Sequence, residues 1–183
     1  MALALTGSTS RVEYTAALIA ATTAMSWCGW VENPIATGTT CKMLACQEDQ
    51  WRVSLNAEKY GGGTPTAGSL YFGRSWGTTD QLTQVQSPGA TWSAKNHVAC
   101  TYDGAATTNA ASFYLNGTLL TNSATRNAAG SIDNATGNPN LGNDNAHTLG
   151  ATGTYGPASF HSVVLTAAEI LEHMATGYTP RGT

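Results

Sequence analysis

The chain has 183 residues, a length typical of one domain with a sizeable core, and we expect a single domain over residues 1–183. Only 10% of the residues are charged, well under the roughly 25% of ordinary soluble domains, and the formal net charge is -3. This balance excludes the basic field that binds nucleic acid and the polybasic patch that binds membranes. A surface so poor in charge suits a protein that rests against other proteins or forms an inert shell.

The first residues predict a strand and not an export signal. Met1, Leu3 and Leu5 alternate with small residues, which is typical of a strand with one apolar side. No basic stretch precedes them, and no apolar run in the chain approaches the roughly 20 residues of a membrane span. We therefore expect a protein that is made in a cytoplasm without a leader.

The cysteines are expected to be buried free thiols, because a cytoplasm keeps thiols reduced. Two of them lack both CxxC spacing and a nearby histidine, so the sequence predicts no zinc site there. The four cysteines are Cys28, Cys41, Cys46 and Cys100, and the two that lack CxxC spacing and a nearby histidine are Cys41 and Cys46.

Short segments of alternating apolar and polar residues follow one another along the chain. Residues 24–33 ("AMSWCGWVEN") carry aromatic residues on both faces, which indicates an inner strand with Trp27 and Trp30 in the core. Regular spacing and turn signals predict an all-β fold, a two-sheet antiparallel sandwich. The further strands are expected at 51–56 with Trp51 in the core, 70–76, 80–88, 96–104 and 158–165, with one or two short ones between 122 and 153.

Residues 112–120 ("SFYLNGTLL") predict a tight hairpin. Asn116 and Gly117 accept the positive φ angles that a type I′ turn needs, and a short apolar run lies on either side.

One short helix is expected near the end of the chain. Thr166 and Glu169 have the spacing of a capping box, and Gly177 is placed to end the helix about three turns later. Ile170, Leu171 and Met174 would form its apolar face, and His173 would lie on its surface. We expect this helix to close an open end of the sandwich.

Four of these segments occur in an order that resembles the laminin-G-like, concanavalin A-like jelly-roll family. They are "MSWCGWVEN", "NHVACTYDG", "SFYLNGTLL" and "ASFHSVVLTAAEI", and the resemblance extends from Leu3 to about Tyr178. It implies a concanavalin A-like jelly roll and a function in binding sugars, other proteins or sometimes calcium. The residues that match the family motifs are Trp30, His97, Val98, Ala99, Tyr102, Asp103, Gly104, Tyr114, Asn116 and Gly117.

The chain also departs from the family pattern. Gly156 and Pro157 stand where the family usually has an Asp-Glu pair before its last strand. The tryptophan expected just before His97 is displaced, and the nearest one is Trp92. A family ligand or calcium site is therefore not carried over to this chain.

The sequence predicts a protein without catalytic activity. The jelly-roll glucanases carry Glu-x-Asp-x-x-Glu on one strand, and no such run occurs here. Glu48 and Asp49 are adjacent, so in a strand they would point to opposite faces. No Gly-x-Ser-x-Gly turn or Cys-His pairing is visible, and His97 is expected to be a packed, hydrogen-bonded residue.

A sugar site or a metal site has few candidate residues. Trp76, near Arg74 and Asp80, is a possible sugar platform, although packing under a loop is the favoured interpretation. The loop with Asn143, Asp144 and Asn145 would complete such a rim. That loop runs from Gly142 to His147, and with Asp133 and Asn134 it offers calcium too few carboxylates for more than a weak site, so no cofactor is expected.

Two functional hypotheses follow. The resemblance to free-standing domains in phage genomes implies a virion structural protein, most simply a bacteriophage capsid decoration (cement) protein. Its partners would be the major capsid protein or other virion proteins, and it would form a homo-oligomer on the particle. The alternative is a lectin-like module that binds glycans for host attachment. Neither hypothesis includes a nucleic acid or membrane partner.

Overall fold

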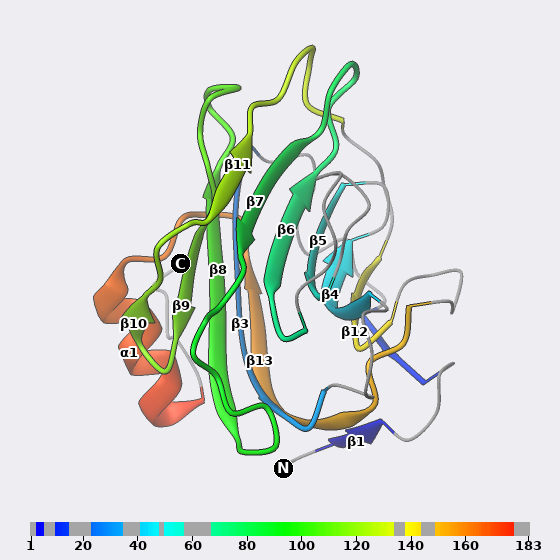
Figure 1. The fold of residues 1–183 in the computed structure, drawn as a ribbon, viewed down its shortest axis with the longest axis vertical. Coiled ribbons are helices and arrows are strands. Elements are labelled where there is room, and N and C mark those ends of the chain that lie inside the picture. Colours follow the sequence, from blue (N-terminus) through cyan, green and yellow to red (C-terminus); the bar gives the residue numbers. More distant parts are fainter. Residues whose placement is uncertain are drawn as a thin grey trace.

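The computed structural model describes residues 3–5, 10–14, 23–34, 41–47, 50–56, 67–133, 138–143 and 149–177. Two antiparallel sheets lie face to face as two layers (Figure 1). This arrangement confirms the predicted β-sandwich.

The first layer is a sheet of six strands. Its order is β1 (Leu3–Leu5), β13 (Gly153–His161), β3 (Ala24–Glu32), β8 (Asn96–Asp103), β9 (Ser112–Leu115) and β10 (Thr118–Leu119). The second layer has seven strands. Their order is β11 (Ala124–Arg126), β7 (Gln81–Val85), β6 (Leu70–Arg74), β5 (Trp51–Leu55), β4 (Lys42–Gln47), β12 (Pro139–Leu141) and β2 (Val12–Glu13).

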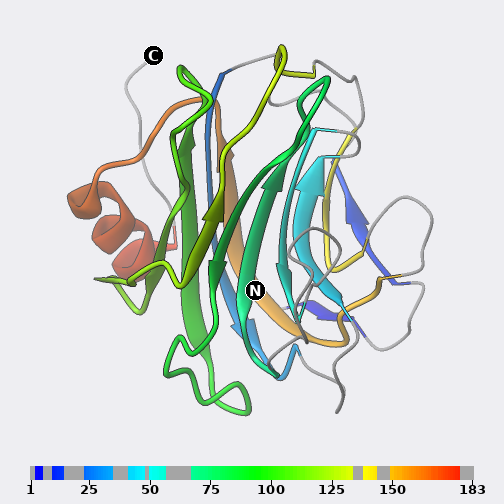
Figure 2. The ribbon, with the colours of Figure 1, turned by 45° about the horizontal axis from the view of Figure 1, so that its top comes forward.

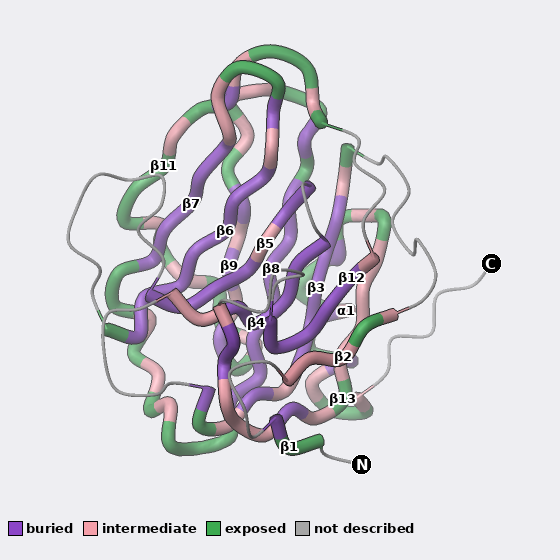
Figure 3. The backbone as a smooth tube through the Cα atoms, turned by 90° about the vertical axis from the view of Figure 1, so that its right-hand side faces the viewer, coloured by how far each residue is buried: buried purple, intermediate pink, exposed green. Residues whose placement is uncertain are grey.

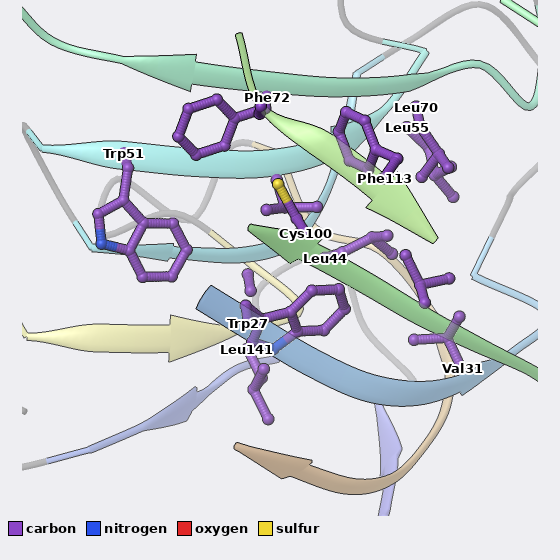
Figure 4. Packing of buried hydrophobic residues seen from close by; sticks show 14 of the residues in the cluster. Trp27, Val31, Leu44, Trp51, Leu55, Leu70, Phe72, Cys100, Phe113 and Leu141 are labelled. Carbon is purple, nitrogen blue, oxygen red and sulfur yellow. The ribbon is translucent and has the colours of Figure 1, made fainter. Parts of the chain in front are cut away.

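The core lies between the two sheets and is filled by alternate residues of their strands. Trp27 of β3 and Trp51 of β5 are both buried there, as predicted, while Phe72 packs against Tyr102 with ring centroids 4.9 Å apart. Large apolar side chains from both layers meet in this space (Figure 4). Burying such side chains supplies most of the driving force for this fold.

Two strands, β2 and β4, were not predicted from the sequence, and the last strand has other bounds than those predicted. β2 has only two residues, and β4 contains a bulge at Leu44, which interrupts its period-two alternation. The last strand was predicted at 158–165, but β13 begins at Gly153 and ends at His161. A bulge in β13 places Gly156 and Pro157 opposite Trp30, and a Cβ atom at Gly156 would lie only 2.8 Å from Trp30 Cβ.

The hairpin between β9 and β10 is as predicted. Asn116 and Gly117 have φ angles of 50° and 79°, and the register pairs Thr118 with Leu115 and Leu119 with Tyr114. The type I′ geometry therefore fixes the register of the edge strand β10.

The helix α1 (Ala167–Thr176) has the predicted ends but not the predicted position. Thr166 and Glu169 form the capping box, and Gly177 ends the helix in the left-handed conformation. The helix does not close an end of the sandwich: it lies against the outer face of the six-stranded sheet (Figure 2). No helix in the described part of the chain is long and apolar enough to span a membrane.

The face that α1 buries also differs from the prediction. Ile170 and His173 are fully buried, whereas Leu171 is 46% exposed. His173 is thus an interior residue and not a surface one. Trp30, predicted to be a core residue, is only half-buried and lies on the same outer face of the sheet, against His97 and Lys95.

Candidate functional site

The predicted sugar platform at Trp76 is not exposed. Only 8% of Trp76 is accessible, and its backbone N–H donates to Asp80 Oδ1 at 3.2 Å. Arg74 is also buried, with its guanidinium nitrogens 3.4 Å from Gln50 Oε1 and 3.3 Å from the Asp133 carbonyl. Packing inside the fold, which was the favoured interpretation of Trp76, is therefore confirmed, and Trp76 offers no exposed platform.

The second half of the predicted rim lies partly outside the described residues, which do not include Asp144 and Asn145. Asn143 is described and fully buried. Its Oδ1 accepts a hydrogen bond from the Leu149 N–H at 3.2 Å, and its carbonyl accepts one from the Cys46 thiol at 3.5 Å. Asn143 therefore holds the base of its loop and presents no side chain to a sugar.

The remaining motif residues have scaffold positions. The Asn116 side chain accepts from the His97 N–H at 2.8 Å and donates to Asn96 Oδ1 at 3.1 Å, so it ties the hairpin to β8. Asp103 accepts from the Ala105 N–H at 3.0 Å and fixes the turn after β8. Tyr102 lies in the core, and Tyr114 is half-buried beside α1.

One residue from each strand of the seven-stranded sheet forms a row across its outer face. Residues directly opposite each other in an antiparallel pair share a face, so the register of neighbouring strands connects one residue from each strand. Phe72, Val53 and Leu141 are next to members of this row along their strands, and they point into the core. We call this set the transverse row: Arg126, Leu82, Gly73, Arg52, Cys46, Asn140 and Glu13.

Two arginines lie on either side of Gly73 in this row: Arg52 is next to it, and Arg126 is separated from it by Leu82. Arg52 is half-buried, and a Cβ atom at Gly73 would lie 3.4 Å from Arg52 Nε, so the Arg52 side chain extends alongside Gly73. Arg126 is also half-buried, and its Nε donates to the Asp80 carbonyl at 3.0 Å. Three strand spacings separate the two arginines, about 14 Å along the row. Gly73 is itself buried, and the Arg52 side chain lies beside it.

Much of the same outer face is removed from solvent. Tyr71 and Leu82 are 5% and 4% exposed, and half-buried Cys41 packs against them. Two inner strands of this sheet, β6 and β7, are buried along their whole length (Figure 3). The arginines of the transverse row are therefore set among sheltered groups, where a charge-assisted hydrogen bond is stronger than in open water.

A second group of functional side chains lies between the six-stranded sheet and α1. Cys28 of β3, His97 of β8 and His173 of α1 are each fully buried, and their ligand atoms lie within 4.8 Å of one another. We call these three residues the Cys-His cluster. It comes from three separate parts of the chain, and for this reason no Cys-His pairing was visible in the sequence.

Burial sets the protonation states in the Cys-His cluster. It lowers the pKa of His97 to about 4, with a further contribution from His173, and it lowers the pKa of His173 to about 4, with a further contribution from His161. It raises the pKa of the Cys28 thiol to about 12. At neutral pH both rings are thus neutral and the thiol keeps its proton, so the cluster has no thiolate nucleophile.

All four cysteines lie in the described part of the chain and are free thiols, as predicted. Cys28, Cys46 and Cys100 are buried, whereas Cys41 is only half-buried.

A family model described as the concanavalin A-like lectin/glucanases superfamily matches residues 6–171. The chain belongs to this superfamily. The match agrees with the resemblance noted in the sequence and with the two-layer fold. A comparison with curated protein sequences gives no match.

Solved structures of similar fold share little sequence with this chain. A heptameric SAP-like pentraxin from Limulus polyphemus has a TM-score of 0.62 and 13% identity, over 94% of this chain and 79% of the pentraxin. A carbohydrate-binding domain (CBM40) of a Ruminococcus gnavus IT-sialidase, bound to alpha2,3 sialyllactose, has a TM-score of 0.58 and 15% identity, over 84% of each chain. The botulinum neurotoxin type G receptor-binding domain has a TM-score of 0.59 and 13% identity, over 95% of this chain and 46% of the toxin domain. At these identities the likeness concerns the fold alone.

Proposed function

We propose that this protein is a non-catalytic carbohydrate-binding module that takes an acidic sugar on the transverse row. The observation that carries the proposal is the pair of half-buried arginines, Arg52 and Arg126, on either side of Gly73. A guanidinium group binds a carboxylate through two parallel hydrogen bonds, which fixes both the position and the orientation of an acidic sugar.

The surroundings of Arg52 are sheltered, which strengthens a hydrogen bond from its guanidinium group to a carboxylate. Gly73 leaves room for the Arg52 side chain to lie along β6, because a Cβ atom there would stand 3.4 Å from Arg52 Nε. Tyr71 and Gln84 lie on the same face, one row away, and are only 5% and 6% exposed, so they belong to the buried surroundings of Arg52.

Among the structures of similar fold, the Ruminococcus gnavus domain is bound to sialyllactose, a sugar that carries a carboxylate. That likeness supports the choice of an acidic sugar, and the arginines of this chain supply the chemical reason.

The absence of catalysis is part of the proposal. The Cys-His cluster has a protonated thiol and neutral, enclosed rings, so it offers no activated nucleophile. Glu48 and Asp49, the adjacent acids considered in the sequence, lie outside the described residues.

A glycan array tests the proposal, with acidic and neutral sugars on the same surface. We expect binding to carboxylate-bearing glycans, and a loss of roughly 10- to 100-fold in affinity in Arg52→Gln, the range for one hydrogen bond to a charged group. Lys95→Gln is the matched control, because it removes one positive charge from an exposed site beside Trp30, on the other sheet. Equal binding by both variants would contradict the proposal.

A second candidate function is a structural subunit on a virus particle, such as a capsid decoration protein. It is supported by the scarcity of charge and by two exposed leucines, Leu119 (58%) and Leu171 (46%), at the edge of the six-stranded sheet. Leu171 packs over the hairpin turn at Gly117, two residues before Leu119. Such a protein would sediment with purified, expanded capsids, would lose this property in the double variant Leu119→Ser, Leu171→Ser, and would keep it in Arg52→Gln.

A further inference from the structure

The Cys-His cluster combines the two side-chain types that soft and borderline metal ions prefer. Cys28 and His97 lie on neighbouring strands of the six-stranded sheet, where Cys28 pairs with Ala99 and His97 with Trp30. The helix α1 adds His173 from above. All three side chains are fully buried, so the geometry of the group is set by packing and not by solvent.

Hydrogen bonding within the cluster is incomplete. His97 Nε2 and His173 Nδ1 lie 2.9 Å apart and share one hydrogen bond. The other two ring nitrogens, His97 Nδ1 and His173 Nε2, are buried and have no hydrogen-bond partner. Buried polar groups are nearly always satisfied in native proteins, and an unsatisfied pair calls for a specific explanation such as an ion.

We propose that Cys28, His97 and His173 bind a zinc ion between α1 and the six-stranded sheet. A thiolate and two imidazoles are common zinc ligands, with Zn–S of about 2.3 Å and Zn–N of about 2.0–2.1 Å in tetrahedral geometry.

The protonation balance is simple. Each imidazole binds the ion through a ring nitrogen that carries no hydrogen, so no proton needs to leave the rings. Cys28 binds as a thiolate and releases its proton to solvent. These three side chains fill three of the four positions of a tetrahedral ion.

Zinc at this place would link the helix to the sheet directly. The residues Ile170 and Leu165 already pack beside Cys28 and Ala99, and the ion would add bonds from β3 and β8 to α1. The role is structural: the ion stabilises the covered face of the six-stranded sheet, while the proposed sugar site lies on the outer face of the other sheet.

The test is a titration of the whole, chelator-treated protein with Co²⁺, whose spectrum reports its ligands. We expect one equivalent to give the near-ultraviolet band of a cobalt–thiolate bond and the visible bands of tetrahedral cobalt, and Zn²⁺ to remove both. Cys28→Ser should lose the near-ultraviolet band, and His173→Gln should weaken the visible bands at least tenfold at equal Co²⁺.

The matched control is Cys100→Ser, because Cys100 is equally buried on the neighbouring strand but faces the core. It should keep both bands. The absence of these bands in the wild-type protein at stoichiometric Co²⁺ would overturn the proposal, and so would an unchanged spectrum in Cys28→Ser. A second measurement needs no variant: zinc should raise the melting temperature of the wild-type protein with increasing free-ion concentration.

Discussion

Replacing Ile170 with alanine should destabilise the protein far more than the same change at Leu171. The two residues are adjacent in α1 and both are apolar. Ile170 is 0% exposed and packs with Leu165, Cys28 and Ala99 against the six-stranded sheet, whereas Leu171 is 46% exposed. The pair therefore separates the burial of a side chain from its hydrophobicity.

The magnitudes follow from that difference. A fully buried isoleucine truncated to alanine loses its transfer free energy and leaves a cavity, which costs about 2–5 kcal/mol. Leu171 lies over Gly117 of the hairpin turn and is 46% exposed, so its replacement leaves no closed cavity and should cost under about 1 kcal/mol. For a chain of this size, about 3 kcal/mol lowers the melting temperature by roughly 6–12 °C.

Urea unfolding followed by circular dichroism measures both variants, with the wild-type protein as reference. The midpoint should fall clearly for Ile170→Ala and little for Leu171→Ala, at an unchanged dependence on urea. Equal losses in the two variants, or a larger loss at Leu171, would refute the position of α1 on the sheet.

Three further predictions concern single residues. Gly117→Ala should cost about 1–2 kcal/mol in unfolding experiments, because alanine disfavours a φ of 79°; an unchanged midpoint would argue against the type I′ turn. Thr166→Ala should cost about 1 kcal/mol, since it removes the helix cap, whereas Thr166→Ser should restore most of it. In native protein, iodoacetamide should modify half-buried Cys41 first and leave Cys100 intact until unfolding, because burial raises the pKa of Cys100 well above its usual range. Mass spectrometry of the peptides would contradict this order if Cys100 reacted early.

The parts of the fold that depend on local chemistry could be predicted from the sequence. An Asn-Gly pair between apolar runs is enough to define a hairpin, and Thr166, Glu169 and Gly177 are enough to define the ends of the helix. Strands with regular alternation were also found. β4 escaped prediction because the bulge at Leu44 places four apolar residues in succession, from Met43 to Cys46.

The candidate sites depend on contacts between distant segments, which the sequence does not display. The buried face of α1 depends on the sheet beneath it. His173 faces Cys28 and His97 of that sheet, whereas Leu171 is exposed. The transverse row exists only through the register of seven strands. A partial signal was present for Arg52, which alternates with inward-facing Trp51 and Val53 and must therefore point outward.

The sequence around Trp76 allowed two interpretations, because an aromatic residue at the end of a strand packs as readily as it protrudes, and the favoured one, packing, is the one observed. The backbone around Trp76 pairs with Ile132, and its N–H bonds to Asp80, so the indole is held inside. Whether Trp76 packs or protrudes depends on the path of residues 129–133, which are distant from it in the sequence.

Calorimetric titration with sialyllactose, and with lactose as the matched neutral sugar, tests the proposed binding of an acidic sugar at Arg52 most directly. We expect heat of binding with sialyllactose alone, a loss of at least tenfold in affinity in Arg52→Gln, and no loss in Lys95→Gln. Equal affinity for the two sugars, or an Arg52→Gln variant that binds sialyllactose like the wild-type protein, would contradict the account.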